Sequence, residues 1–210
     1  MAAVGVLALQ GDFAAHAVAL ADAGVEASEV RRPRELAGLD GLVLPGGEST
    51  TLLNLMGDEP WFEALRGFHA AGGALLGTCA GAILLARRVI PDQPSLGLLD
   101  AVVERNAFGR QRESFELRLQ TPSLGGPLEG VFIRAPRFRG LGPGVEVLAR
   151  LGEEPILVRE GNVLAATFHP ELAGSSGLHR LFARIANARS RSLVTAVPSP
   201  YVGRDRVAGR

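Results

Sequence analysis

Residues 75–81, Leu-Leu-Gly-Thr-Cys-Ala-Gly, contain the only cysteine in this chain of 210 residues. The apolar residues just before it, 72–76, predict a buried strand, and residues 82–88 predict a helix. A residue on a tight strand-to-helix turn has its side chain exposed, and the next backbone N–H groups are free. This is the arrangement of a nucleophile elbow, here with cysteine in place of serine. The helix N-terminus behind Cys79 favours the thiolate form. The alternative is a buried structural cysteine, because free cysteine is among the most buried residue types.

The segments around this turn predict its place in a larger sheet. Before it we expect strands at 4–9, 25–30 and 41–44 and helices at 13–23, 51–56 and 61–71. After it we expect strands at 99–104, 115–119, 131–134, 145–150, 156–159 and 163–167 and a final helix at 178–188. Early alternation followed by many strands predicts an α/β fold, with a mostly parallel central sheet flanked by helices and an antiparallel extension. Residues 1–189 would form one domain, and residues 190–210 a flexible tail.

A candidate base for the thiol follows the predicted strand at 163–167. His169 and Glu171 lie two residues apart, and they share one side of the chain if it stays extended. Pro170 favours this, because it restricts itself and the residue before it to extended conformations. A thiol nucleophile needs a base, and the base needs an acceptor that orients it. A solvated surface histidine is the alternative for His169 alone, but with Cys79 the three residues indicate a catalytic triad.

A glycine turn follows the predicted strand at 41–44. Pro45, Gly46 and Gly47 precede a helix that we expect Ser49 or Thr50 to cap. Paired glycines let backbone N–H groups approach a ligand without a Cβ in the way, as an oxyanion hole requires. A plain strand–turn–helix connection is the alternative. Gly46, Cys79 and His169 all follow predicted parallel strands, and binding sites in such sheets lie at the carboxyl ends.

Composition and charge argue against several classes of function. Apolar residues make up 47% of the chain and charged residues 21%, with a formal net charge of zero. We therefore expect neither a nucleic-acid groove nor a membrane surface, and no apolar stretch reaches membrane-spanning length. The N-terminal residues read as a strand rather than as a signal peptide. A single cysteine permits no internal disulfide, which suits the reducing cytoplasm.

The chain has no lysine, since all 22 basic residues are arginine. Genomic base composition is one explanation of this bias. Whatever its origin, the chain cannot form a side-chain Schiff base or a Walker-type phosphate site. Imine chemistry in any associated pathway must therefore occur on another polypeptide.

Six segments together resemble a known family. The PGG turn, the G-x-C-x-G elbow and the later H-P-E are similar to the signatures of class I (triad) glutamine amidotransferases. Within that class, residues 1–187 resemble the glutaminase subunits of bacterial pyridoxal 5′-phosphate synthases. The matching segments are LALQG (7–11), PGGESTT (45–51), GTCAG (77–81), VERN with FGRQ (103–106 and 108–111), FIRAP (132–136) and FHPEL (168–172).

The resemblance implies hydrolysis of L-glutamine to glutamate and ammonia. Cys79 would be the nucleophile, His169 the base and Glu171 the residue that orients it. Backbone N–H groups of Gly47 and Ala80 would form the oxyanion hole. The residues implied to bind glutamine are Gly47, Glu48, Ser49, Arg105, Ile133 and Arg134. A guanidinium suits the substrate α-carboxylate, although a surface ion pair between Arg105 and a neighbouring glutamate is the alternative.

The resemblance also implies a partner, and no cofactor or metal on this chain. The partner would be a synthase subunit with a (β/α)8 barrel, which receives ammonia within a large hetero-oligomer. Two alternatives stay open: a glutaminase subunit of another amidotransferase, such as imidazole glycerol phosphate synthase, and a non-catalytic regulatory protein on the same fold. One departure is Arg137, which stands where the family commonly has histidine. We expect it to alter contacts near the site or the partner without removing activity.

Overall fold

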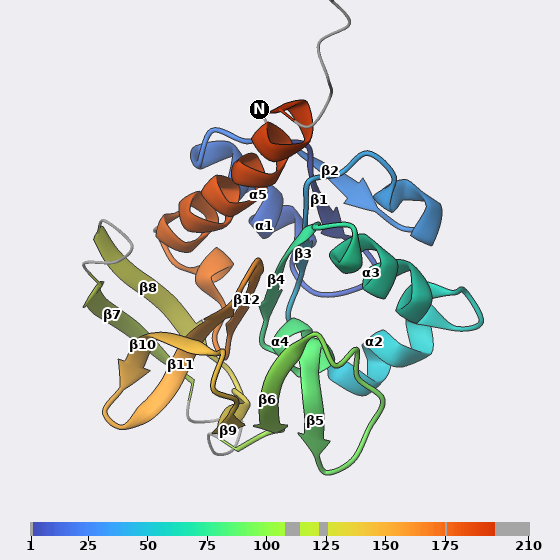
Figure 1. The fold of residues 1–210 in the computed structure, drawn as a ribbon. Coiled ribbons are helices and arrows are strands. Elements are labelled where there is room, and N and C mark those ends of the chain that lie inside the picture. The colour runs from blue at the N-terminus through green and yellow to red at the C-terminus, as the bar shows by residue number, and fades with distance from the viewer. Residues whose placement is uncertain (1, 108–113, 122–125, 175, 196–210) are drawn as a thin grey trace, which may run out of the picture.

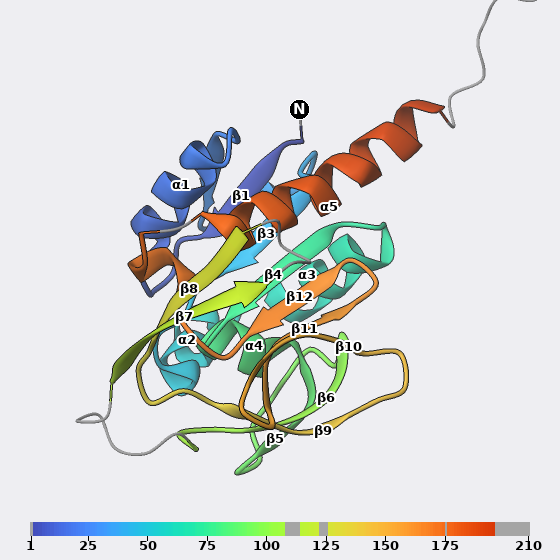
Figure 2. The same ribbon diagram turned by 90° about the vertical axis from the view of Figure 1, so that its left-hand side faces the viewer.

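The computed structural model describes residues 2–107, 114–121, 126–174 and 176–195. A seven-stranded sheet crosses the molecule, with helices on both of its faces (Figures 1 and 2). In spatial order its strands are β10 (Glu146–Leu151), β11 (Glu154–Glu160), β12 (Val163–Ala166), β4 (Ala74–Thr78), β3 (Gly41–Leu44), β1 (Val4–Leu7) and β2 (Ala27–Val30). The five strands from β12 to β2 are parallel, whereas β10 and β11 are antiparallel. The predicted α/β fold with a mostly parallel sheet is confirmed.

Two smaller sheets make the extension, which is antiparallel except at one pair of strands. One contains β5 (Ala86–Ile90), β6 (Leu99–Glu104) and β9 (Arg137–Leu141), and the other contains β7 (Phe115–Thr121) and β8 (Gly126–Phe132). Strand β5 pairs parallel with β6, whereas β6 pairs antiparallel with β9, and β7 pairs antiparallel with β8. In Figure 1, β7 and β8 lie at the left near β10, whereas β5 and β6 lie at the bottom below α4.

The main sheet separates two apolar cores because its strands alternate their side chains between the faces. On β3, Leu42 and Leu44 point into one core and Val43 into the other. The helices that cover the first core are α2 (Ser49–Met56), α3 (Trp61–Ala70) and α4 (Ala80–Leu85). Those that cover the second are α1 (Phe13–Asp22) and α5 (Gly177–Thr195), which lie side by side in both ribbon views.

One predicted element is wrong. The helix expected at 82–88 ends at Leu85, and the chain turns at Ala86 into β5. Local helix propensity predicted the longer helix, but pairing of β5 with β6 and burial of Ala86 and Val89 override it. Strand β9 and the short 3-10 helices η1 (Pro33–Leu36) and η4 (Pro170–Leu172) were not predicted.

The C-terminal helix is longer than the sequence suggests. It was expected to end at 188, before a tail that begins at 190, but α5 continues to Thr195. Residues 196–210 and the matching segment 108–111 lie outside the described residues. The division into a domain at 1–189 and a tail stays a prediction.

Candidate active site

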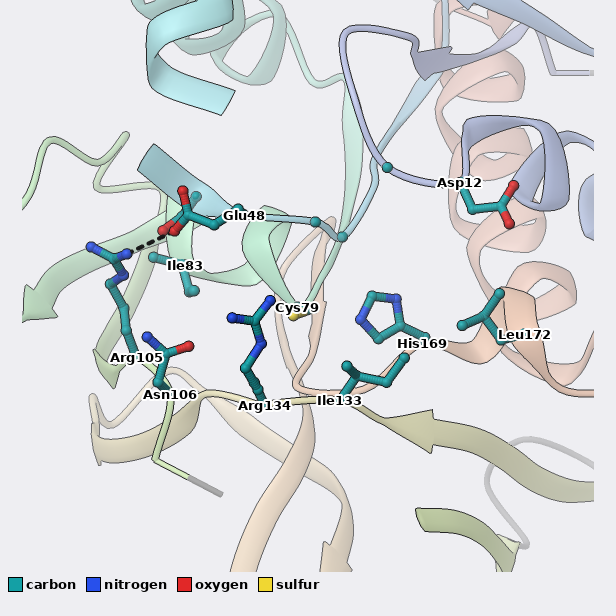
Figure 3. Close-up of a pocket in the computed structure, with 14 residues that line it drawn as sticks. Asp12, Glu48, Cys79, Ile83, Arg105, Asn106, Ile133, Arg134, His169 and Leu172 are labelled. Carbon is teal, nitrogen blue, oxygen red and sulfur yellow. Dashed lines mark hydrogen bonds and ion pairs between the residues drawn. The ribbon is translucent and has the colours of Figure 1, made fainter. Parts of the chain in front are cut away.

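A pocket of about 290 Å³ opens at the carboxyl edge of β3, β4 and β12 (Figure 3). Its volume is at the small end of the range for ligand pockets, roughly 300–1,000 Å³, so it suits a molecule the size of an amino acid. The residues that line it are Gly11, Asp12, Gly46, Gly47, Glu48, Ser49, Cys79, Ile83, Arg105, Asn106, Ile133, Arg134, His169 and Leu172. Strand β4 lies between β3 and β12, which places Cys79 between the glycine turn and His169.

Cys79 occupies a strained turn between β4 and α4. Its φ is 47°, which lies in the left-handed region that few non-glycine residues adopt. Its N–H donates to the Ala166 carbonyl of β12 (2.9 Å), and its carbonyl accepts from the Ile83 N–H of α4 (3.1 Å). The backbone is therefore fixed on both sides, and the side chain, 6% exposed, reaches the pocket.

Two glycines make this turn possible. A Cβ on Gly81 would lie 2.0 Å from the Leu44 carbonyl oxygen, and one on Gly77 would lie 2.6 Å from the Gly81 backbone. The start of α4 thus packs directly on β3, the strand that leads to the glycine turn. In the G-x-C-x-G pattern, the glycines set the close approach of backbones rather than flexibility.

His169 is positioned by hydrogen bonds of its own backbone and by a glycine, Gly46, that faces its ring. Its N–H donates to the Val131 carbonyl (2.8 Å) and its carbonyl accepts from the Val131 N–H (3.0 Å), so β8 holds it just after β12. A Cβ on Gly46 would lie 2.3 Å from the ring Cε1 of His169. Gly46 thus leaves room for the imidazole, which lies between Cys79 and Leu172 in Figure 3.

Glu171 reaches His169 by an unexpected route. The chain does not stay extended: it enters η4 directly after His169, with Pro170 in the first position. This 3-10 turn still brings Glu171 Oε1 to 2.8 Å from His169 Nδ1. The Glu171 side chain is fully buried and that of His169 is 12% exposed, so the hydrogen bond is largely shielded from water.

Burial and hydrogen bonds shift the pKa values of this pair in opposite directions. Burial alone raises the pKa of Glu171, but hydrogen bonds from His16 and His169 outweigh it and hold the pKa at about 2. Burial alone lowers the pKa of His169, but hydrogen bonding and charge interaction with Cys79 and Glu171 raise it to about 10. At neutral pH these shifts favour an ionised carboxylate beside a charged imidazolium, which is the state that stabilises a thiolate.

Glu48 makes contacts that the sequence did not predict. The expectation that Ser49 or Thr50 caps α2 is wrong, because Glu48 is the N-cap and accepts from the Thr51 N–H (2.9 Å). Although partial burial raises the pKa of Glu48, hydrogen bonds from Thr50 and Thr51 lower it to about 2. Its other oxygen pairs with Arg105 Nη2 at 2.9 Å (Figure 3). The alternative reading of Arg105, an ion pair with a glutamate, is therefore observed inside the pocket.

The structure brings the other expected binding residues to the same pocket. Gly47, Ser49, Ile133 and Arg134 all line it, with Ile133 and Arg134 directly after β8. Ala80 does not line the pocket, but it begins α4, whose first N–H groups have no partner within the helix.

Sequence reasoning missed five of the lining residues: Gly11, Asp12, Ile83, Asn106 and Leu172. A signal exists for Asn106, which follows Arg105 within a matching segment and has a φ of 51°. Asparagine is enriched at such positions because its short polar side chain tolerates the left-handed region.

Arg137 lies away from the pocket. It begins β9, and its Nη1 is 3.8 Å from Glu154 Oε1 on β11, a carboxylate that Arg139 also approaches. The charge therefore connects the antiparallel extension to the main sheet rather than lining the site. Among the described residues, no cluster of His, Cys, Asp and Glu could hold a metal ion. No helix within the described ranges is long and apolar enough to cross a membrane.

Comparison with known proteins places the chain in a family. Residues 6–187 match the model of the SNO glutamine amidotransferase family. The chain belongs to this family. A solved structure described as a glutamine amidotransferase is 56% identical, has a TM-score of 0.82, and is matched over 88% of this chain and 98% of its own. A putative GMP synthase subunit from Thermoplasma acidophilum, 18% identical with a TM-score of 0.67, shares the fold over 93% of this chain and 98% of its own.

Two curated relatives carry the same description. The pyridoxal 5′-phosphate synthase subunit PdxT of a Thermus thermophilus strain is 59% identical over 87% of this chain and 97% of its own. The subunit of that name from Deinococcus radiodurans is 52% identical over 89% of this chain and 98% of its own. The likeness therefore covers almost the whole of each relative.

Proposed function

We propose that this chain is the glutaminase subunit of a pyridoxal 5′-phosphate synthase and uses Cys79, His169 and Glu171 as its triad. The observation that carries the proposal is that Cys79 and His169 line one pocket and Glu171 contacts His169 Nδ1 at 2.8 Å, in a chain of the SNO glutamine amidotransferase family. The relatives named pyridoxal 5′-phosphate synthase subunits support the pathway. The reaction converts L-glutamine and water to L-glutamate and ammonia.

The first half of the reaction transfers the glutamyl group to Cys79. The thiolate attacks the side-chain amide carbon and forms a C–S bond. The C–N bond then breaks, and ammonia leaves with a proton from the His169 imidazolium. Glu171 keeps the ring oriented and stabilises its charged form through the 2.8 Å hydrogen bond.

The second half releases glutamate. Neutral His169 takes a proton from water, whose oxygen attacks the thioester carbon. The C–S bond breaks, and Cys79 returns to the thiolate beside a protonated His169. In both halves the tetrahedral oxyanion would accept hydrogen bonds from the N–H groups of Gly47 and Ala80, the first from the glycine turn and the second from the start of α4.

Glutamine binding would use the polar wall of the pocket. We assign the substrate α-carboxylate to Arg105, whose fork of N–H groups fits two carboxylate oxygens. Glu48 pairs with Arg105 in the free protein, so it supplies a matching anion for the substrate α-ammonium group. Gly47, Ser49, Ile133 and Arg134 complete the contacts around the carbon chain and amide.

The ammonia would pass to a synthase subunit with a (β/α)8 barrel, in a hetero-oligomer located in the cytoplasm. The absence of lysine from this chain supports that division of labour, because imine chemistry with a sugar aldehyde or ketone needs a lysine on the partner. This chain would need no cofactor of its own.

The complex with its synthase subunit tests the proposal with two nitrogen sources. Cys79→Ala should abolish glutamine hydrolysis, whereas pyridoxal 5′-phosphate formation from an ammonium salt should continue at the parent rate. A matched alanine substitution outside the site, Leu55→Ala on the exposed face of α2, controls for handling of the complex. Glutamate release by Cys79→Ala at near the parent rate would overturn the triad. Loss of the ammonium-dependent reaction would overturn the division of labour.

A further inference from the structure

Two histidines outside the proposed triad are completely buried. His16 lies on α1 and His179 on α5, and neither exposes any surface. Burying a polar ring costs free energy unless its nitrogens find partners. These two rings pair with each other, with His16 Nδ1 at 2.9 Å from His179 Nε2. They are 163 residues apart in sequence, so only the packing of α1 on α5 brings them together.

The second nitrogen of His16 faces the triad. His16 Nε2 lies 3.3 Å from Glu171 Oε2, within ion-pair distance, and 3.3 Å from the Thr78 hydroxyl, at the long end of hydrogen bonding. The other oxygen of Glu171 is the one bound to His169. The carboxylate of Glu171 is therefore held between two imidazoles, one at each oxygen.

This arrangement fixes the proton positions along the chain of contacts. An ionised carboxylate only accepts hydrogen bonds, so His169 Nδ1 and His16 Nε2 must both donate. A neutral imidazole carries a single N–H, so His16 Nδ1 accepts and His179 Nε2 donates to it. Burial lowers the pKa of His179 to about 3, which keeps that ring neutral.

We propose that His16 is a positioning residue of the glutaminase site, which holds Glu171 ionised and aimed at His169, and that His179 selects the required tautomer of His16. The inference rests on the proposed function and deepens it. The site then extends beyond the triad, from Cys79 through His169 and Glu171 to the two helices on the far side of η4. His16 touches neither the substrate pocket nor the reacting atoms.

The groups that face this cluster come from every element packed around it. His169 at the end of β12 and His16 on α1 face Glu171, while His179 on α5 and Thr78 on β4 face His16. Strand β8 also packs on η4, but its carboxylate Glu129 pairs with Arg118. At the start of α1, Asp12 accepts from a backbone N–H of its own helix. Titration of Glu171 is therefore governed by the histidines.

A pair of substitutions at His16 separates positioning from packing. His16→Leu keeps the approximate volume and removes the donor, whereas His16→Gln can place an amide N–H near the former Nε2. In the complex with its synthase subunit, His16→Leu should lower kcat for glutamine hydrolysis about 10-fold with KM within about 2-fold, and His16→Gln should recover most of the loss. Leu20→Ala, one turn along α1 and equally buried, controls for simple destabilisation.

The pH dependence of kcat/KM is the measurement that a purely structural role of His16 would leave unchanged. Loss of a donor to the ionised form raises the pKa of Glu171, so the acid limb of kcat/KM should move upward by about one pH unit in His16→Leu. The limb should return in His16→Gln and stay in place in Leu20→Ala. Wild-type kcat and an unmoved limb in His16→Leu would overturn the proposal.

A measurement on the unmodified chain covers the case in which His16→Leu does not fold. Ring ¹⁵N chemical shifts should show His16 and His179 neutral, each protonated at Nε2, at pH 7. Protonation at Nδ1 of His16 would overturn the proposed hydrogen bonds. Wild-type complex that releases no glutamate would refute the proposed function instead, and the ring shifts would still decide the hydrogen-bonding pattern.

Discussion

The two walls of the pocket hold their functional groups by different means. On the side of the parallel sheet, the backbone positions Cys79 through a strained φ of 47° and the direct contact of Gly81 with β3. On the side of the antiparallel extension, Arg105 follows β6 and is held by its side-chain ion pair with Glu48. We call the side with Cys79 and Gly81 the nucleophile wall, and backbone geometry holds it. We call the side with Arg105 and Glu48 the substrate wall, and charge holds it.

This difference predicts which changes each wall tolerates. A Cβ at Gly81 would lie 2.0 Å from the Leu44 carbonyl oxygen, and that carbonyl belongs to the central sheet, so the contact cannot admit one extra carbon. A partly exposed ion pair can lose a partner at modest cost, because water replaces part of the interaction. Substitutions that add a methyl group should damage the first wall, and substitutions that remove charge should damage the second.

The largest effect is expected at Gly81. Gly81→Ala forces Cβ against the Leu44 carbonyl, so it should lower the free energy of unfolding by ~3 kcal/mol or more and remove glutaminase activity. Gly67→Ala is the matched control: it lies inside α3 with no atom near its Cβ position, and it should stabilise by ~0.5–1 kcal/mol. Urea denaturation followed by circular dichroism measures both. Equal stability of the two variants would refute the backbone account of the nucleophile wall.

A smaller effect should appear in the pH dependence of stability. Glu171 has a folded-state pKa of about 2, below its ordinary 4.5, so its contribution is fully present above pH 4.5 and is lost as pH falls toward 2. The free energy of unfolding of wild type minus that of Glu171→Gln should therefore decrease by ~1–3 kcal/mol over this window.

Glu48→Gln tests how exposure changes the contribution of a carboxylate, in comparison with the buried Glu171. Glu48 also has a pKa of about 2, but its side chain is 44% exposed, against full burial for Glu171. Added salt should reduce the Glu48 contribution and leave that of Glu171 nearly unchanged, because screening acts on exposed charges. Similar salt sensitivity in both variants would contradict the distinction.

The substrate wall should respond through KM. Arg105→Ala should raise KM for glutamine about 10-fold in the complex, with kcat within about 3-fold, because it removes a charge-assisted contact to the bound substrate. Arg159→Ala is the matched control and should leave KM unchanged. Arg159 lies on β11 opposite Leu164, near the start of β12, and does not line the pocket. An unchanged KM in Arg105→Ala would mean that this arginine serves only Glu48.

The smallest effect is expected at Arg137. Arg137→His restores the residue common in the family and weakens a 3.8 Å contact with Glu154 that is partly exposed to solvent. We expect a change of stability within ~0.5 kcal/mol and unaltered kinetic constants for glutamine. A change in KM would show that the extension transmits strain to the pocket, which the geometry of the two walls does not predict.

Much of the fold and of the site can be predicted from the sequence. Apolar runs bounded by glycine predicted the parallel strands, and the turns after them placed Gly46, Cys79 and His169 at one edge. Local signals failed where a distant partner decides the outcome. The chain leaves the helix at Ala86 because β6 pairs with the next residues. The cap of α2 was missed for a local reason, since the Glu48 side chain reaches the Thr51 N–H in place of Ser49 or Thr50.

The sequence by itself determined the proposed nucleophile, its proposed base and the glycines around them, because short-range backbone geometry requires those residue types at fixed spacings. Only the tertiary structure decided that Glu171 meets His169 through a 3-10 turn, and that His16 and His179 lie behind it. No periodicity marks two lone histidines on separate helices. Their role arises from the burial of one carboxylate, whose charge must find donors wherever the packed helices supply them.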